Sequence, residues 1–190
     1  QEVSDDERPS SKDIADQYIC RQFEREIPDI GGDQQKLVDD WFSQYKKITR
    51  KDENNPSLIK DHIVHFLNQH PELAVNFAPD DIIFSLETSY LRYGNYGEFV
   101  AFLKWYRDNF RPAYNQAAPF FDHYLIAYNL VQGKTEDIPE LFTFFKTYPD
   151  ESADCLARVI DLLKATDEEN LLLNLLGDIS LQVFYSPKLM

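Results

Sequence analysis

Two histidines beside an acid have the most metal-like spacing in the chain. His62 and His65 stand three residues apart, and Asp61 directly precedes the first of them. Residues at this spacing share one face of a helix, so the two imidazoles could be presented to a divalent cation. The chain has only four histidines and no HExxH pattern, however. We therefore predict no metal site and no cofactor, and keep as an alternative an all-α metal-binding or enzymatic domain that uses His62 and His65.

The other reactive side chains form no catalytic pattern. Asp39-Asp40 and Asp80-Asp81 are adjacent pairs, and neighbouring side chains diverge around a helix instead of sharing a proton. Cys20 and Cys155 lie far apart without a CxxC motif, which argues against a zinc knuckle and against a disulfide framework. Solitary cysteines are usually small buried apolar residues. The expected protein is not an enzyme.

A small basic stripe is the remaining cluster of charged groups. Lys104, Arg107 and Arg111 recur at i, i+3 and i+7, and Asp108 interrupts them. Such a stripe could receive an acidic peptide. Cations are also favoured near the C-terminus of a helix, where they compensate its dipole, and we favour this second interpretation. Trp105, which lies off the main apolar stripe of its helix, is a candidate for an exposed binding aromatic.

Composition narrows the classes of partner. The 190 residues include 19 Lys and Arg against 33 Asp and Glu, so the net charge is 19 − 33 = −14. A chain this acidic repels phosphate backbones, which makes nucleic acid an unsuitable partner and leaves an acidic inhibitor of a basic partner as a further alternative. No apolar run reaches the roughly 18 residues needed to span a bilayer. Because the first residue is Gln1, we expect an upstream segment to have been removed; the cytoplasm is slightly favoured, with export after processing as the alternative.

Helical periodicity, bounded by proline, glycine and capping residues, runs through most of the chain. Residues 1–11 are polar and acidic and predict a flexible tail, whereas residues 12–190 predict a single helical-repeat domain. No segment alternates with period two, so no sheet is expected. The expected helices cover residues 12–27, 33–48, 56–70, 79–94, 95–111, 120–131, 135–148, 151–164 and 170–185.

These helices suggest successive pairs joined by short turns. The chain would reverse near Asp52, Gly94, Gly133 and Thr166, at spacings close to those of helical-repeat proteins. The predicted fold is therefore an all-α stack of about four helical hairpins with an extra N-terminal helix. The last helix is apolar on more than one face and lacks a polar cap. It is expected to pack against a second copy, a partner chain or further residues beyond Met190.

One turn carries a family resemblance. The segment Tyr90-Leu91-Arg92-Tyr93-Gly94-Asn95-Tyr96-Gly97-Glu98 resembles the turn region of tetratricopeptide repeats, in which a first-helix tyrosine, a turn glycine and a following tyrosine recur at these offsets. Gly94 would allow the backbone to reverse with positive φ, while the tyrosines wedge between the helices. Phe99 replaces the small second-helix residue of the family, and the closing proline comes one position late, at Pro112.

The resemblance implies a right-handed α-α superhelix whose concave wall is lined by the first helix of each pair. It implies a non-enzymatic scaffold that binds a peptide or protein partner in that groove. The Lys and Asn residues with which some family members clamp a C-terminal carboxylate are missing, so that ligand is not predicted. Carried over by offset from the turn, the partner-binding positions are Asp81, Phe84, Thr88, Leu91, Phe120, His123, Ala127 and Leu130.

Overall fold

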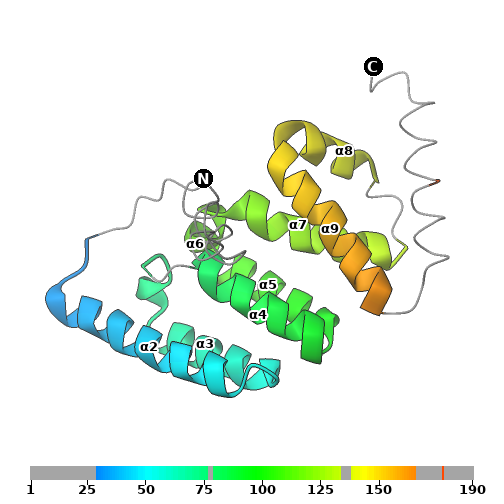
Figure 1. The fold of residues 1–190 in the computed structure, drawn as a ribbon. Coiled ribbons are helices and arrows are strands. Elements are labelled where there is room, and N and C mark those ends of the chain that lie inside the picture. The colour runs from blue at the N-terminus through cyan, green and yellow to red at the C-terminus, as the bar shows by residue number, and fades with distance from the viewer. Residues whose placement is uncertain (1–28, 77–78, 134–137, 166–176, 178–190) are drawn as a thin grey trace, which may run out of the picture.

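The computed structural model describes residues 29–76, 79–133, 138–165 and Gly177, and the regular secondary structure of these residues is entirely helical (Figure 1). The expected all-α fold class is confirmed for them. The tail at residues 1–11 and the helices expected at 12–27 and 170–185 lie outside the described residues. None of the described helices is long and apolar enough to cross a membrane.

The first two described helices are α2 (Gly32–Lys51) and α3 (Pro56–Gln69). The start of α3 follows the sequence signal, because the side chain of Asn55 accepts a hydrogen bond of 3.2 Å from the backbone N–H of Leu58. Pro56 takes the first helical position, where its missing N–H costs nothing. A short 3-10 helix, η2 (Pro71–Leu73), follows α3.

The next pair is α4 (Pro79–Tyr93) and α5 (Tyr96–Asn109). The side chain of Asn95 caps α5 by accepting a hydrogen bond of 2.9 Å from Gly97 N–H. The start of α5 thus agrees with the helix expected at residues 95–111.

The stretch after α5 contains a helix that the sequence analysis treated as a loop. The α6 helix (Arg111–Asn115) precedes α7 (Ala118–Val131). Pro112 was expected to stop the preceding helix, but it lies in the first turn of α6. That position tolerates proline because the N–H groups of the first turn have no partner within the helix.

The last described helices are α8 (Ile138–Thr147) and α9 (Pro149–Ala165). The α9 helix begins at Pro149, two residues before the helix expected at residues 151–164, so Tyr148 alone joins the two helices. Gly133, with φ of 75°, follows α7 and supplies the left-handed backbone conformation that favours glycine.

The glycine at the other predicted turn has a different role. Gly94 has no positive φ, so the expectation of a left-handed residue there is wrong. A Cβ atom at Gly94 would lie 2.7 Å from Cδ1 of Tyr90 and 2.8 Å from Cγ of Pro56. Glycine is needed here because the side chains of two helices approach its backbone too closely for a methyl group.

Helices that are neighbours in the chain pack side by side from α2 to α5, and α5 also contacts α6 and α7. The hydroxyl of Tyr45 on α2 donates a hydrogen bond of 3.1 Å to the carbonyl of Ile82 on α4, which ties the first pair to the second. The most extensive contact among the described elements joins α7 to α9, which crosses α7 in Figure 1. The expected pairing of α7 with α8 is therefore not its main packing contact.

One continuous hydrophobic core connects the helices from α2 to α9. It runs from Val38 on α2 to Leu163 on α9. Its centre is rich in rings: Phe99 lies 6.4 Å from Tyr90 and 5.5 Å from Tyr124 between ring centroids, so three helices meet through aromatic contacts.

Candidate functional site

An open groove of about 710 Å³ lies between α5, α7 and α8. Its volume is within the range of sites that hold a drug-sized molecule or a few residues of a peptide. Side chains of α5, of α7 and of the end of α8 line it; we call the apolar ones its floor and the charged and polar ones, which include Asp122 and Asn129 of α7, its edges.

The floor of the groove is apolar. Leu125 and Ile126 on α7 line it together with Phe144 on α8. Tyr148, at the end of α8, continues this surface outward and remains 38% exposed, with its ring centroid 5.3 Å from that of Phe144. A ligand could bury part of this surface without any rearrangement of the core.

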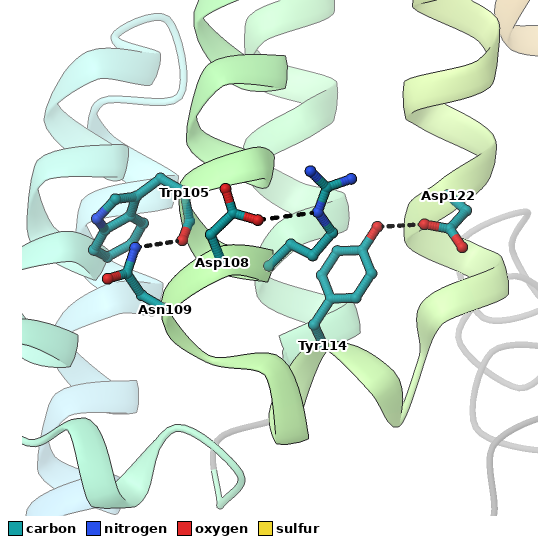
Figure 2. Close-up of polar contacts among 6 residues, drawn as sticks. Trp105, Asp108, Asn109, Tyr114 and Asp122 are labelled. Carbon is teal, nitrogen blue, oxygen red and sulfur yellow. Dashed lines mark hydrogen bonds and ion pairs between the residues drawn. The ribbon is translucent and has the colours of Figure 1, made fainter.

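Two cations on α5 line one edge. Lys104 is exposed, and Arg107 is partly buried. Nε of Arg107 lies 3.3 Å from Oδ1 of Asp108, an exposed pair of neighbours in sequence. Figure 2 shows Asp108 in this pair and Asn109, whose side-chain amide donates a hydrogen bond of 2.8 Å to the Trp105 carbonyl. Exposed ion pairs of this kind contribute little to stability.

A tyrosine and an acid connect α6 to the groove. The hydroxyl of Tyr114 donates a hydrogen bond of 2.5 Å to Oδ1 of Asp122, a groove residue on α7 (Figure 2). Burial raises the pKa of Asp122, while the Tyr114 hydrogen bond, Arg107 and Arg111 act in the opposite direction. Burial and the neighbouring Asp122 carboxylate raise the pKa of Tyr114, so its hydroxyl stays a donor.

The basic stripe expected from the sequence is divided between two helices. Lys104 and Arg107 lie on α5, whereas Arg111 begins α6. Trp105 is partly buried against Phe102 and Phe110, with ring centroids 5.8 and 5.4 Å away, so it packs within the protein. The apolar floor of the groove was not among the expected site residues. The sequence feature that could have indicated it is that α7 is apolar on more than one face.

The α4 half of the predicted partner-binding strip lies against the core. Phe84, Thr88 and Leu91 are partly buried, and the Phe84 ring centroid is 6.5 Å from that of Phe120 on α7. Asp81 lies within the first turn of α4, and its side chain is outside the described part of the structure. The two halves of the strip therefore meet at Phe84 and Phe120.

The α7 half of the strip is fully packed. Phe120, His123, Ala127 and Leu130 are each at least nine-tenths buried, on the helix that α9 covers most extensively. A partner could reach these four residues only if helices that pack on α7 moved. Their role in binding stays a prediction, and the accessible surface of α7 is the groove instead.

The structure also brings together polar side chains from four helices, which are enclosed except for Arg158, whose side chain is 16% exposed. Nε of Arg158 on α9 is 2.9 Å from Oε1 of Glu87 on α4, and the hydroxyl of Tyr96 on α5 donates a 2.9 Å hydrogen bond to the same oxygen. The Arg158 guanidinium also lies over the ring of Tyr124 on α7, 5.8 Å from its centroid. Glu87 is 0% exposed, and burial raises its pKa to about 7 although Arg158 and Tyr96 oppose this shift.

A buried histidine lies beside this cluster. His123 is 2% exposed, and its ring centroid is 4.0 Å from that of Tyr124. Burial, reinforced by the positive charge of Arg158, lowers the pKa of His123 to about 3, so the imidazole is neutral at physiological pH. Because Glu87 is fully enclosed and Arg158 is only partly exposed, the cluster is suited to hold α9 against α4 and α7.

A local signal for Glu87 exists in the sequence. It lies four residues after Ile83 and three before Tyr90, which places an acid on the otherwise apolar face of α4. Nothing local points to Arg158 as its partner, because the two residues are far apart in the chain.

Of the two histidines that suggested a metal site, only His62 takes part in packing. The ring of His62 stacks on Trp41 with centroids 5.3 Å apart, whereas His65 is exposed. Burial, and secondarily the neighbouring His65, lowers the pKa of His62. Within residues 29–76, 79–133 and 138–165, no three histidine, cysteine or acidic side chains gather where they could hold a metal ion.

The cysteine that the structure describes is enclosed as well. Cys155 is a buried free thiol, and its pKa is raised to about 12 by burial and the nearby Asp154. It is therefore protonated and a poor nucleophile. Cys20 lies outside the described residues.

Comparison with known proteins was negative: no family model, no curated protein and no solved structure matches this chain.

Proposed function

We propose that the chain is a non-enzymatic helical scaffold that holds a peptide segment of a partner protein in the groove between α5, α7 and α8. One observation carries this proposal: the groove combines an apolar floor with charged and polar edges and remains open. Recognition surfaces have this composition, because apolar contacts supply binding energy while polar groups at the edge fix orientation.

The choice of this groove over the strip on α4 and α7 follows from accessibility. The α7 part of that strip is buried in the core, so binding there requires helices that pack on α7 to move. The groove uses other positions of the same helix, such as Ile126, which is only partly buried. Binding there requires no such movement.

We further propose that the helices form a tetratricopeptide-like, right-handed superhelix. The sequential packing of α2, α3, α4 and α5 supports this proposal, as does the tight turn at Gly94 between α4 and α5. In this arrangement, stacked hairpins supply a rigid frame, and a rigid site loses less conformational entropy when it binds a flexible peptide.

Selection from a displayed library of random peptides tests the function. Enriched peptides would be synthesised, and their affinity measured by fluorescence anisotropy for the wild type and for an Ile126→Ala, Tyr148→Ala double variant of the groove. The matched control is Leu58→Ala with Ile160→Ala, which removes two exposed apolar side chains elsewhere. We expect about tenfold weaker binding for the groove variant and none of this loss for the control.

Two results would contradict the proposal. One is a selection that enriches no peptide; the other is an enriched peptide that binds both double variants as tightly as the wild type. Circular dichroism and thermal unfolding of each variant would establish that its fold is intact, so that a loss of affinity reports on the groove.

A further inference from the structure

We infer that the groove selects peptides in which an acidic side chain lies close to a bulky apolar one, with Lys104 and Arg107 contacting the carboxylate. This inference rests on the proposed function, since it names the ligand class of the same groove. Its support comes from the distribution of charge around the groove and from the position of the apolar floor.

Among the acids that the structure describes, few are paired with Lys104 and Arg107. The two cations stand three residues apart on one face of α5, and both line the groove. Lys104 forms no ion pair with the acids of the described residues. Arg107 is paired through Nε with Asp108, whose side chain is 62% exposed. A carboxylate from a ligand could therefore be bound without breaking a buried ion pair.

An acid, Asp122, lines the same groove. Asp122 would repel an acidic ligand if its charge faced the groove without compensation. Its Oδ1 already accepts the hydrogen bond of Tyr114, and Arg107 and Arg111 both act on its charge. Tyr114 of α6 thus holds the Asp122 carboxylate, while Arg107 and Arg111 compensate part of its charge.

An apolar surface lies next to the two cations. Ile126, Phe144 and Tyr148 line the groove together with Lys104 and Arg107. A peptide that placed a carboxylate on α5 would bring its neighbouring residues over this surface. An aliphatic or aromatic residue there would bury apolar area, which favours binding.

The charge of the whole chain sharpens the inference. With a net charge of −14, the protein attracts basic ligands and repels acidic ones at long range. Preference for an acidic peptide can then come only from cations in direct contact with it. A test must therefore separate local contact from total charge.

Three pools of short synthetic peptides provide this test. Each pool is rich in Leu and Phe, and the pools differ only in their polar residues. One pool carries Asp and Glu, the second Lys and Arg, and the third Ser and Asn. Binding of each is measured by anisotropy to the wild type and to Lys104→Gln with Arg107→Gln. The control is Lys36→Gln with Arg50→Gln, two exposed residues of α2 whose loss changes the net charge equally.

We expect the acidic pool to bind the wild type most tightly and to lose about tenfold in affinity in the Lys104 and Arg107 variant. The α2 control should bind it as the wild type does. Preference for the basic or neutral pool, or equal losses in the two charge variants, would overturn the inference while the groove remained the binding site. If no pool binds, or if the Ile126 and Tyr148 variant binds unchanged, the proposed function itself fails.

Discussion

Nε of Arg158 on α9 lies 2.9 Å from Oε1 of Glu87 on α4, and the Glu87 side chain is completely enclosed. A buried pair of this kind adds little net stability when intact, because desolvation offsets most of the attraction between the charges. Losing one partner is costly, however, because the other charge is left in a medium of low polarity. We therefore expect the pair to influence where α9 docks more than it adds to the free energy of unfolding.

The first prediction is that Arg158→Met destabilises the protein by about 3 kcal/mol, because Glu87 is left buried without its cation. Urea unfolding followed by circular dichroism measures this loss. Arg92→Met, which removes an exposed arginine from α4, should stay within about 0.5 kcal/mol of the wild type. Combining Arg158→Met with Glu87→Leu should restore most of the stability; a double variant as unstable as the single one would contradict this account.

The second prediction concerns the pH dependence that Glu87 contributes. Its pKa rises from 4.5 to about 7 on folding, so the folded state holds the proton more tightly than the unfolded state does. Stability from this group is complete below the unfolded pKa and falls as the pH rises through the folded one. Against Glu87→Gln, the wild type should therefore lose a few kcal/mol between about pH 4.5 and pH 7. A difference that does not change with pH would contradict the prediction.

The third prediction has the opposite sign and concerns His123. Its pKa falls from 6.5 to about 3 on folding, so the unfolded state binds the proton more readily. Stability is complete above the unfolded pKa and is lost as the pH falls toward the folded one. Relative to His123→Phe, the wild type should lose about 2 kcal/mol between about pH 7 and pH 5. Because Glu87 opposes this slope, only the difference between the two proteins isolates His123.

The fourth prediction compares the effect on stability of replacing two glycines, Gly94 and Gly32, by alanine. Gly94→Ala should cost about 1 to 3 kcal/mol, because the new methyl group would overlap Tyr90 and Pro56. Gly32→Ala is the control: no atom lies within 4 Å of its Cβ position, and alanine favours the helix. Thermal unfolding should place Gly32→Ala at or above the wild type. Equal stability of the two variants would rule out close packing as the reason for Gly94.

The fifth prediction tests the Tyr114 contact with the groove. Its hydrogen bond lowers the pKa of Asp122 against the effect of burial. Tyr114→Phe should therefore raise that pKa further and cost about 1 kcal/mol of stability. A titration of the carboxyl carbon by NMR measures the pKa. Tyr93→Phe, which removes an exposed hydrogen bond to Glu53, should leave it unchanged; an unaltered titration in Tyr114→Phe would contradict the contact.

The helices themselves could be predicted from the sequence because their signals are local. Asn55 and Asn95 mark helix starts with side chains that bind the first free N–H groups, and both cap in the structure. Proline was the less reliable signal. Pro112 and Pro149 directly follow the helices expected at residues 95–111 and 135–148, where a proline can end a helix. Each instead lies in the first turn of a new helix, which tolerates a residue without a backbone N–H.

Contacts between helices that are distant in the sequence could not be predicted from local capping and periodicity. Periodicity marks which face of a helix is apolar but not which helix covers it, so α9 was not expected on α7. For the same reason, Phe120 and His123 were interpreted as groove residues although they are buried. The groove of Lys104 and Ile126 depends on this packing, and therefore only the basic residues on its edge could be recognised beforehand.

The position of α9 has a consequence for how the molecule unfolds. Arrays in which each hairpin touches only its neighbours lose their ends one repeat at a time. Here Arg158 bridges past α8 to α7 and α4, so detaching α9 would expose the aromatic surface of α7 and disrupt the centre of the core. Residues 79–133 and 138–165 should consequently melt in a single cooperative transition, and their folding should be slowed by the need to close the long loop between Glu87 and Arg158.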